Sequence, residues 1–234
     1  MGQIVMLTPF PDSSPLTKFA KDEYRDITDL TVIGTDTGLD MVTNYYQIEY
    51  HIGPIIDKAK AIEKRGGCDA LIVGCFGDPG LMAVRQVTSM PVLGTAEASL
   101  CTAAMVGDKI GIIVPQEDVL SVTEKTIRAY NFSNHVVAIR SVGELWWEIV
   151  QGQSQESVAK MVDLCLQIIR GDGADVVIFG CIGFAWMVNQ IREFIAKEGL
   201  KTPIIEPGLT VYNAAKMIVE LGLNQDRRKL KINL

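Results

Sequence analysis

The sequence has little histidine, no excess of basic charge and no long apolar run, and each shortage excludes a class of function. Two histidines among 234 residues are too few for a histidine-rich metal site and weaken any histidine-based acid–base scheme. Lys and Arg total 22 against 28 Asp and Glu, and the formal net charge of −6 argues against binding nucleic acid through its phosphates. No apolar run approaches the roughly 20 residues that span a bilayer, and the first 14 residues lack the pattern of a signal peptide. We therefore expect a cytoplasmic protein that binds neither nucleic acid nor membrane.

Cysteine is the reactive residue that the chain does contain. There are five, Cys68, Cys75, Cys101, Cys165 and Cys181, an odd number with no C-x-x-C pair. Without a secretory signal, such residues are expected to be reduced thiols and not a disulfide framework or a redox pair. The question for function is which of these thiols take part in chemistry.

Short, continuously apolar segments alternate with helical stretches along the chain. We expect strands at Ile4–Leu7, Leu30–Ile33, Ala70–Val73, Pro91–Leu93, Ile110–Val114, Val136–Ile139, Val176–Phe179 and Ile204–Ile205. We expect helices at about 15–24, 49–65, 78–87, 96–106, 117–130, 154–170, 184–198 and 209–221. This alternation predicts an α/β fold with parallel sheets that are covered on both faces.

The chain also contains an internal repeat at an offset of 106 residues. The run GCDALIVGCFG at 67–77 falls on GADVVIFGCIG at 173–183, with six of the eleven positions identical. Unrelated segments of average composition would match at roughly one position or fewer. In the same register residues 3–9 fall on 109–115, and after a small insertion 90–93 align with 202–205. We infer two pseudo-symmetric Rossmann-like (flavodoxin-like) lobes with parallel sheets and an active-site cleft between the lobes.

The repeat separates the five cysteines into two groups. Cys68 aligns with an alanine, and Cys101 and Cys165 lie in helical stretches with apolar neighbours, so we interpret these three as small packing residues. Cys75 and Cys181 align with each other, and each follows an apolar strand and a glycine. Each is therefore expected at the carboxyl end of a parallel strand beside a helix N-terminus. Open α/β sheets bind ligands there, and the pKa of a thiol there should be lowered.

Two opposed thiols suit one kind of reaction. The symmetry predicts that Cys75 and Cys181 face each other across the cleft. One thiolate would remove a proton from a carbon beside a carbonyl, and the other group, as a thiol, would return a proton to the opposite face. Gly77 and Gly183 would leave backbone N–H groups open to a substrate oxygen. Such chemistry inverts the carbon with no cofactor, whether metal or organic.

At these residues the sequence resembles the aspartate/glutamate/hydantoin racemase superfamily over nearly the whole chain. The run Gly74–Leu81, GCFGDPGL, is similar to the hydantoin racemase branch, in which F-G-D-P-G-L is characteristic. The amino-acid racemases of the superfamily usually carry polar residues after their cysteines, whereas Phe76 and Ile182 follow here. The resemblance implies a cofactor-independent racemase with Cys75 and Cys181 as acid and base. It also implies a neutral ring as substrate, such as a 5-substituted hydantoin or allantoin.

Candidate substrate contacts surround the two cysteines. Pro9 and Pro115 end the first strand of each lobe and are expected to face the cleft, while Asn44 belongs to the segment Met41–Tyr46, which stands where the hydantoin racemase branch has a different polar loop. The complete set of expected contacts is Thr8, Pro9, Phe10, Asn44, Phe76, Gly77, Pro115, Ile182, Gly183 and Phe184.

Other polar residues near these segments are given simpler roles. We interpret Asp78 as a helix N-cap, and His51 and His135 as surface or structural residues. Glu206 follows the last strand of the second lobe, from where it can reach the cleft.

Three alternatives remain open at the level of sequence. The chain can be an amino-acid racemase of the Asp/Glu type, a maleate-type isomerase or decarboxylase of the same superfamily, or a relative that binds a small molecule without turnover. By the same resemblance, the last helix of each half packs on the other lobe. Lobe one is then residues 1–96 plus 208–234, and lobe two is 97–207. The expected partners are a small-molecule substrate and other copies of the chain in a homo-oligomer.

Overall fold

The computed structural model describes residues 2–143, 146–152 and 154–226. By its internal contacts the chain forms two compact units, one of Met1–Thr95 with Val211–Leu234 and the other of Ala96–Thr210. The expected first lobe includes residues 227–234, which lie outside the described part. No helix formed by the described residues is long and apolar enough to cross a membrane.

The first unit is built on a four-stranded parallel sheet. Its strands are β1 (Ile4–Pro11), β2 (Leu30–Thr35), β3 (Ala70–Val73) and β4 (Val92–Gly94), in the order β2-β1-β3-β4. Its helices are α1 (Pro15–Glu23), α2 (Tyr45–Arg65), α3 (Leu81–Val87) and most of α9 (Pro207–Glu220). Every residue of β3 is buried, as expected for a strand covered on both faces.

The second unit repeats this arrangement. Its strands are β5 (Ile110–Val114), β6 (Val136–Ser141), β7 (Val176–Phe179) and β8 (Ile204–Ile205), in the order β6-β5-β7-β8 and again parallel. The helical segments are α4 (Thr95–Val106), η1 (Glu117–Val119), α5 (Leu120–Ala129), α6 (Trp146–Gly152), α7 (Gln155–Leu166), η2 (Gln167–Gly171), η3 (Ile182–Met187) and α8 (Val188–Lys197). Both strand orders are flavodoxin-like, so the expected α/β fold is confirmed.

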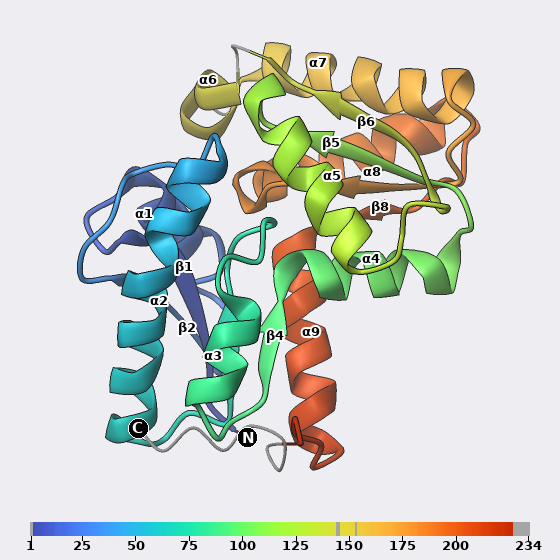
Figure 1. Cartoon of the computed structure of the whole chain (residues 1–234). Coiled ribbons are helices and arrows are strands. Elements are labelled where there is room, and N and C mark those ends of the chain that lie inside the picture. Colours follow the sequence, from blue (N-terminus) through green and yellow to red (C-terminus); the bar gives the residue numbers. More distant parts are fainter. Residues whose placement is uncertain (1, 144–145, 153, 227–234) are drawn as a thin grey trace. The chain divides into compact units, whose positions relative to one another are not determined.

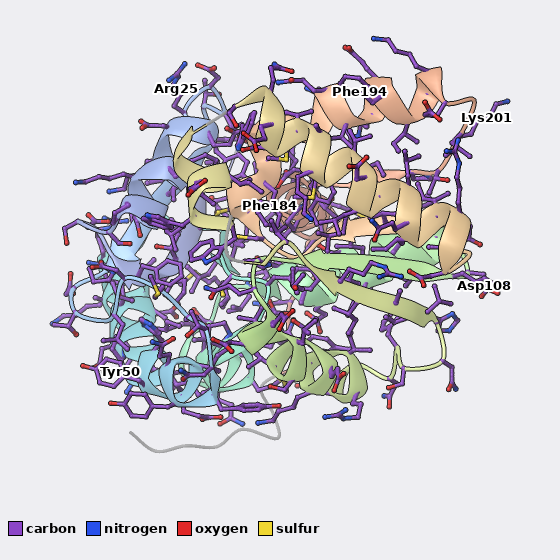
Figure 2. All side chains as sticks on the ribbon, turned by 90° about the horizontal axis from the view of Figure 1, so that it is seen from above. Arg25, Tyr50, Asp108, Phe184, Phe194 and Lys201 are labelled. Carbon is purple, nitrogen blue, oxygen red and sulfur yellow. The ribbon has the colours of Figure 1, made fainter. Side chains whose placement is uncertain are left out.

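Right-handed crossovers decide which face of each sheet a helix covers. Because β1 connects to β2 in one direction and β2 to β3 in the other, α1 lies on one face and α2 and α3 lie on the opposite face. In the second unit α7 and α8 pack side by side on one face, away from α5 (Figures 1 and 2). Because all strands within a unit are parallel, their carboxyl ends lie at the same edge of the sheet.

The repeat seen in the sequence is present in the backbone. The first residues of β5, β6 and β7 each follow those of β1, β2 and β3 by 106 residues, from Ile4 to Ile110 in the first pair. Gly67 and Gly173 adopt φ of 76° and 74°, which explains the shared glycine. Asp69 accepts the backbone N–H of Gln3, and Asp175 accepts that of Lys109, at 2.6 and 2.9 Å. Both shared residues are thus explained by local structure.

Most of the predicted helices are present, but some begin at other residues than predicted. Ser14 caps α1 and Pro15 is its first residue, as predicted. The prediction that Asp78 caps a helix was wrong, because Asp78 has φ of 45° within a turn and α3 begins only at Leu81. The helix α6 was not predicted, and α2 starts at Tyr45, four residues earlier than expected.

Candidate active site

Cys75 lies just beyond the carboxyl end of β3. The preceding Gly74 donates its N–H to the carbonyl oxygen of Leu7 at 2.8 Å, which extends the pairing of β3 with β1 by one residue. The chain then turns, because Asp78 N–H donates to the Cys75 carbonyl oxygen at 3.0 Å. Cys75 itself is half-buried. The residues Thr8, Pro9 and Phe10 follow Leu7, so this bond brings them beside the cysteine segment.

Cys181 occupies the equivalent place beyond β7. Gly180 donates its N–H to the carbonyl oxygen of Ile113 at 2.7 Å, and Phe184 N–H donates to the Cys181 carbonyl oxygen at 3.2 Å. Each of these bonds joins residues 106 positions after their counterparts around Cys75. Cys181 is also half-buried, and Pro115 follows β5 beside it. Each unit therefore carries a cysteine at the same strand end with two equivalent backbone hydrogen bonds, although a turn follows Cys75 and the η3 helix follows Cys181.

The glycine before each cysteine is required by close packing at the strand end. A Cβ on Gly74 would lie 2.8 Å from Cγ of Met6, and a Cβ on Gly180 would lie 2.9 Å from Cγ1 of Val114. Both approaches are shorter than ordinary van der Waals contact. Packing thus explains the shared glycines before the two cysteines.

The thiol of Cys181 lies in an environment that the sequence did not predict. Burial raises the pKa of Cys181 to about 11, the Gly183 N–H lowers it, and the nearby Glu206 carboxylate raises it further. The expected lowering of the pKa by a helix N-terminus is therefore wrong for this thiol. The Gly183 N–H, expected to be open to a substrate oxygen, donates to Sγ of Cys181 at 3.4 Å. A Cβ on Gly183 would also meet Val150 at 2.8 Å.

The other three cysteines divide between the core and the surface. Cys165 is fully buried, and burial raises its pKa to about 12, which confirms its interpretation as a packing residue. Burial also raises the pKa of Cys68 to about 11. Cys101 is exposed on α4, so its interpretation as a buried packing residue was wrong. Within the described part of the chain no three His, Cys, Asp or Glu side chains are grouped to hold a metal ion.

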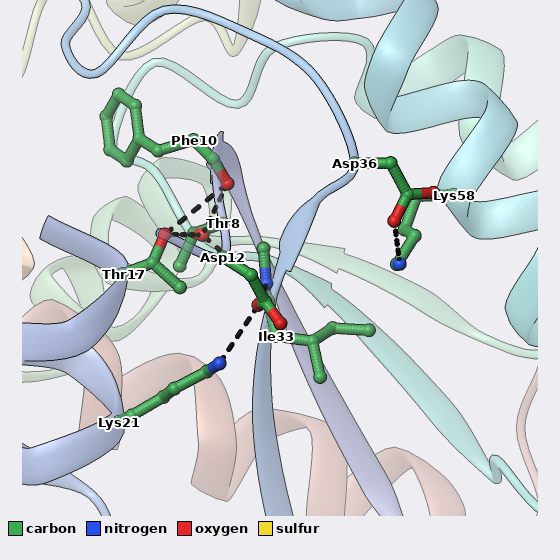
Figure 3. A network of polar contacts seen from close by, with 9 residues as sticks. Thr8, Phe10, Asp12, Thr17, Lys21, Ile33, Asp36 and Lys58 are labelled. Atoms are coloured by element: carbon green, nitrogen blue, oxygen red, sulfur yellow. Dashed lines mark hydrogen bonds and ion pairs between the residues drawn. The ribbon is translucent and has the colours of Figure 1, made fainter. Parts of the chain in front are cut away.

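Hydroxyl groups hold the end of β1 in a defined shape. The Oγ1 atoms of Thr8 and Thr17 lie 2.7 Å apart, and each lies 3.4 Å from the carbonyl oxygen of Phe10 (Figure 3). Thr35 Oγ1 donates to the Pro9 carbonyl oxygen at 3.0 Å. Thr8 is fully buried and Phe10 is nearly so. These contacts are those of residues that shape the strand end.

A carboxylate ties the same strand end to β2. Asp12 Oδ1 accepts the Gly34 N–H at 2.5 Å and the ammonium of Lys21 at 3.0 Å (Figure 3). Burial opposes ionisation, but these two partners outweigh it and lower the pKa of Asp12. The Pro9–Asp12 segment is consequently fixed to both α1 and β2.

The remaining expected contacts lie in different surroundings. Asn44 is exposed and caps α2 by accepting the Gln47 N–H at 3.0 Å. Phe76 and Ile182, the residues after each cysteine, are buried, and Gly77 is half-buried. Phe184 is fully buried in the second unit with its ring edge-on to Phe179 at 6.1 Å (Figure 2). Its contacts are those of a core residue.

His51 is a structural residue of the core and not a surface residue, which decides between the two roles that the sequence left open. Its ring is fully buried, with its edge towards Phe10 at 5.7 Å, and neither ring nitrogen has a hydrogen-bond partner among the described residues. The signal was present in the spacing, since His51 shares the apolar face of α2 with Ile48, Ile55 and Ala59. His51 thus packs beneath the segment that carries Phe10.

The buried imidazole predicts a pH dependence of stability. Burial lowers the pKa of His51, although the backbone carbonyls of Pro9 and Met41 act in the opposite direction. Below its ordinary pKa the unfolded chain takes up a proton that the folded chain does not, so stability is lost as the pH falls through that range. We expect His51→Phe to reduce this loss, as measured by urea unfolding at about pH 7 and pH 5. Tyr50→Phe, which alters a neighbouring ring, serves as the control; an unchanged loss in His51→Phe would contradict the argument.

Comparison with known proteins agrees with this architecture. The profile of the Asp/Glu/Hydantoin racemase family matches residues 17–215. A hydantoin racemase from Pseudomonas sp. (strain NS671) is 27% identical over 212 residues, which cover 90% of this chain and 82% of that protein. One from Paenarthrobacter aurescens is 24% identical over 226 residues, covering 94% and 92%. Allantoin racemase from Klebsiella pneumoniae shares the fold with a TM-score of 0.86 at 21% identity, covering 97% of this chain and 91% of that one.

The family match spans most of the chain, and the hydantoin racemases align with it almost from end to end. The chain belongs to the Asp/Glu/hydantoin racemase family and is an isomerase of the racemase type.

Proposed function

We propose that this racemase inverts a carbon next to a carbonyl by two-thiol acid–base catalysis, with Cys75 and Cys181 as the catalytic pair. The proposed substrate is a 5-substituted hydantoin or an allantoin-like ring, and the reaction uses no cofactor. The observation that carries the proposal is the pair of equivalent backbone hydrogen bonds around one half-buried cysteine in each unit.

Elimination among the repeated residues supports the role of the thiols. Of the shared glycines, Gly67 and Gly173 adopt positive φ and Gly74 and Gly180 permit close packing, and the shared aspartates bind the backbone at the start of a strand. Ile72 and Ile178 fill the two cores. The cysteines are half-buried at the carboxyl ends of equivalent parallel strands, where α/β sheets bind ligands, which favours a chemical role.

The proposed reaction balances with the two thiols alone. In one direction the Cys75 thiolate takes the proton from the chiral carbon, and the electron pair of that C–H bond moves into an enolate with the adjacent carbonyl. The Cys181 thiol then donates its proton to the opposite face of the carbon. The products are the inverted substrate, a Cys75 thiol and a Cys181 thiolate, which is the arrangement needed for the reverse direction.

The residues after the cysteines support a neutral substrate. Phe76 and Ile182 are buried apolar side chains and offer no charged group for an amino-acid carboxylate. Two relatives that align over most of this chain are named hydantoin racemases. A cyclic amide needs hydrogen-bonding groups but no counter-ion, which fits such surroundings.

Isotope exchange tests the proposed function. One enantiomer of a 5-substituted hydantoin, of allantoin, of aspartate or of glutamate is incubated with the protein in heavy water, and a parallel sample contains no protein. For a cyclic substrate we expect protein-dependent inversion with incorporation of deuterium at the chiral carbon. Chiral chromatography measures the inversion, and mass spectrometry measures the deuterium. Exchange with the amino acids alone would replace the proposed substrate class. The absence of protein-dependent exchange with every compound would reject the racemase mechanism.

A further inference from the structure

A buried carboxylate stands at the strand end next to Cys181. Glu206 follows β8 directly and is only 4% exposed. Its Oε1 accepts the Gly208 N–H at 2.7 Å and its Oε2 accepts the Leu209 N–H at 2.5 Å, in the first turn of α9. Two backbone donors and a helix N-terminus favour the ionised carboxylate, so a fixed negative charge is held here.

The register of the sheet places this charge near the thiol. β7 and β8 are neighbours with Ile178 opposite Ile205, so Glu206 stands at the same carboxyl edge from which the chain continues to Cys181. Adjacent parallel strands lie about 4.8 Å apart. Burial is the largest cause of the raised pKa of Cys181, and the negative charge of Glu206 raises it further, while the Gly183 N–H lowers it.

The first unit brings a carboxylate to the matching place by another route. In the repeat Gly94, at the end of β4, corresponds to Glu206. A Cβ on Gly94 would run into the carboxylate of Asp78, which comes from the turn after Cys75 and is itself buried. Different chain positions therefore deliver a carboxylate to the same strand end, and this convergence is not explained by the capping of α9 alone.

We propose that Glu206 is a positioning residue that holds Cys181 as the protonated thiol in the free protein. The catalytic meaning of this inference rests on the proposed function. When Cys75 acts as the base, the proton donor is Cys181 in its thiol form. Glu206 touches no reacting atom in this scheme. It acts through the ionisation of Cys181 and sets which half of the cycle the resting protein is ready to perform.

Site-resolved alkylation tests the inference without any substrate. The native protein is treated with iodoacetamide across a range of pH, and mass spectrometry follows the peptide of each cysteine. We expect Glu206→Gln and Glu206→Asn to increase the alkylation rate of Cys181 at mildly alkaline pH by roughly three- to tenfold, because both remove the charge and keep a hydrogen-bond acceptor. Glu206→Asp keeps the charge and should keep the slow rate.

Two controls separate the charge of Glu206 from general loosening. Glu198→Gln removes an exposed carboxylate of the same unit, paired with Arg170 at 2.9 Å, and should leave Cys181 unchanged. The buried Cys165 reports local opening within each sample and should alkylate equally in all folded variants. Equal Cys181 rates in the charged and neutral variants would overturn the inference, and so would a parallel increase at Cys165.

Activity then separates this inference from the proposed function. In the racemisation pH profile, the loss of rate at high pH reports ionisation of the proton donor, and we expect Glu206→Gln to move this loss to lower pH. If alkylation shifts but no compound exchanges deuterium, the proposed function fails and the role of Glu206 in thiol ionisation stands. If exchange is normal but neither the alkylation rate nor the alkaline limb moves, the inference about Glu206 fails alone.

Discussion

Cys75→Ser and Cys181→Ser are each expected to lower racemisation by about three orders of magnitude while the protein remains folded. A serine hydroxyl is close in size to a thiol but ionises only at a far higher pH, so it can act neither as base nor as an equivalent acid. Both cysteines are half-buried, so the change in packing is expected to be small. The measurement is the rate of inversion by chiral chromatography, with circular dichroism as the check of folding.

The two variants should also differ in which enantiomer they still deprotonate. With Cys75 replaced, Cys181 can remove a proton from the enantiomer that presents its C–H bond to it, and the same thiol returns a solvent-derived deuteron to the same face. The result is deuterium exchange without inversion for one enantiomer. With Cys181 replaced, the other enantiomer should exchange.

Cys101→Ser is the matched control, because Cys101 is exposed on α4 and has no part in the proposed chemistry. It should racemise at the parental rate. Full activity in either Cys75→Ser or Cys181→Ser would refute the two-thiol mechanism. Identical exchange of both enantiomers in a single variant would refute the assignment of one face to each thiol.

The fold was predictable because its main signals are local and repeated. Continuously apolar segments of four or five residues, such as Ala70–Val73 and Ile110–Val114, were found with their observed bounds. The repeat added an independent constraint, since one offset relates three strand pairs and the residues around the two cysteines. Such signals depend on short-range patterning, which the sequence carries directly.

The chemical state of Cys181 was not predictable in the same way. A cysteine between a strand and a helix suggests a lowered thiol pKa, but burial raises the pKa of Cys181, and Glu206, 25 positions further along the chain, raises it further. Whether that carboxylate reaches the thiol depends on the pairing of β7 with β8. The prediction that Asp78 caps a helix was wrong for a related reason. Asp-Pro is typical of a helix start, and only the observed φ of 45° at Asp78 reveals a turn.

The close approach of β2 to the end of β1 predicts the largest effect on stability. Gly34 is buried in β2, and a Cβ there would lie 2.5 Å from both the Asp12 nitrogen and the Phe10 carbonyl oxygen. These are backbone atoms in a segment held by Thr8, Thr17 and Lys21, so no side-chain rotation can relieve the overlap. The register between β1 and β2 also shifts at this place, which leaves the strand end closely apposed to Gly34.

Gly34→Ala should therefore lower the free energy of unfolding by about 3 kcal/mol, measured by urea denaturation followed by circular dichroism. Gly171→Ala is the matched control, because Gly171 ends η2 with no atom within 4 Å of the added Cβ. In a helical segment that change should leave stability equal or slightly higher. Displacement of the Phe10–Asp12 backbone should also raise the KM of Gly34→Ala, since this segment lies beside Cys75. Equal unfolding midpoints for the two alanine variants would show that the Phe10–Asp12 backbone moves at little cost to accommodate the added Cβ. Such a result would refute the rigid support of this segment beside Cys75.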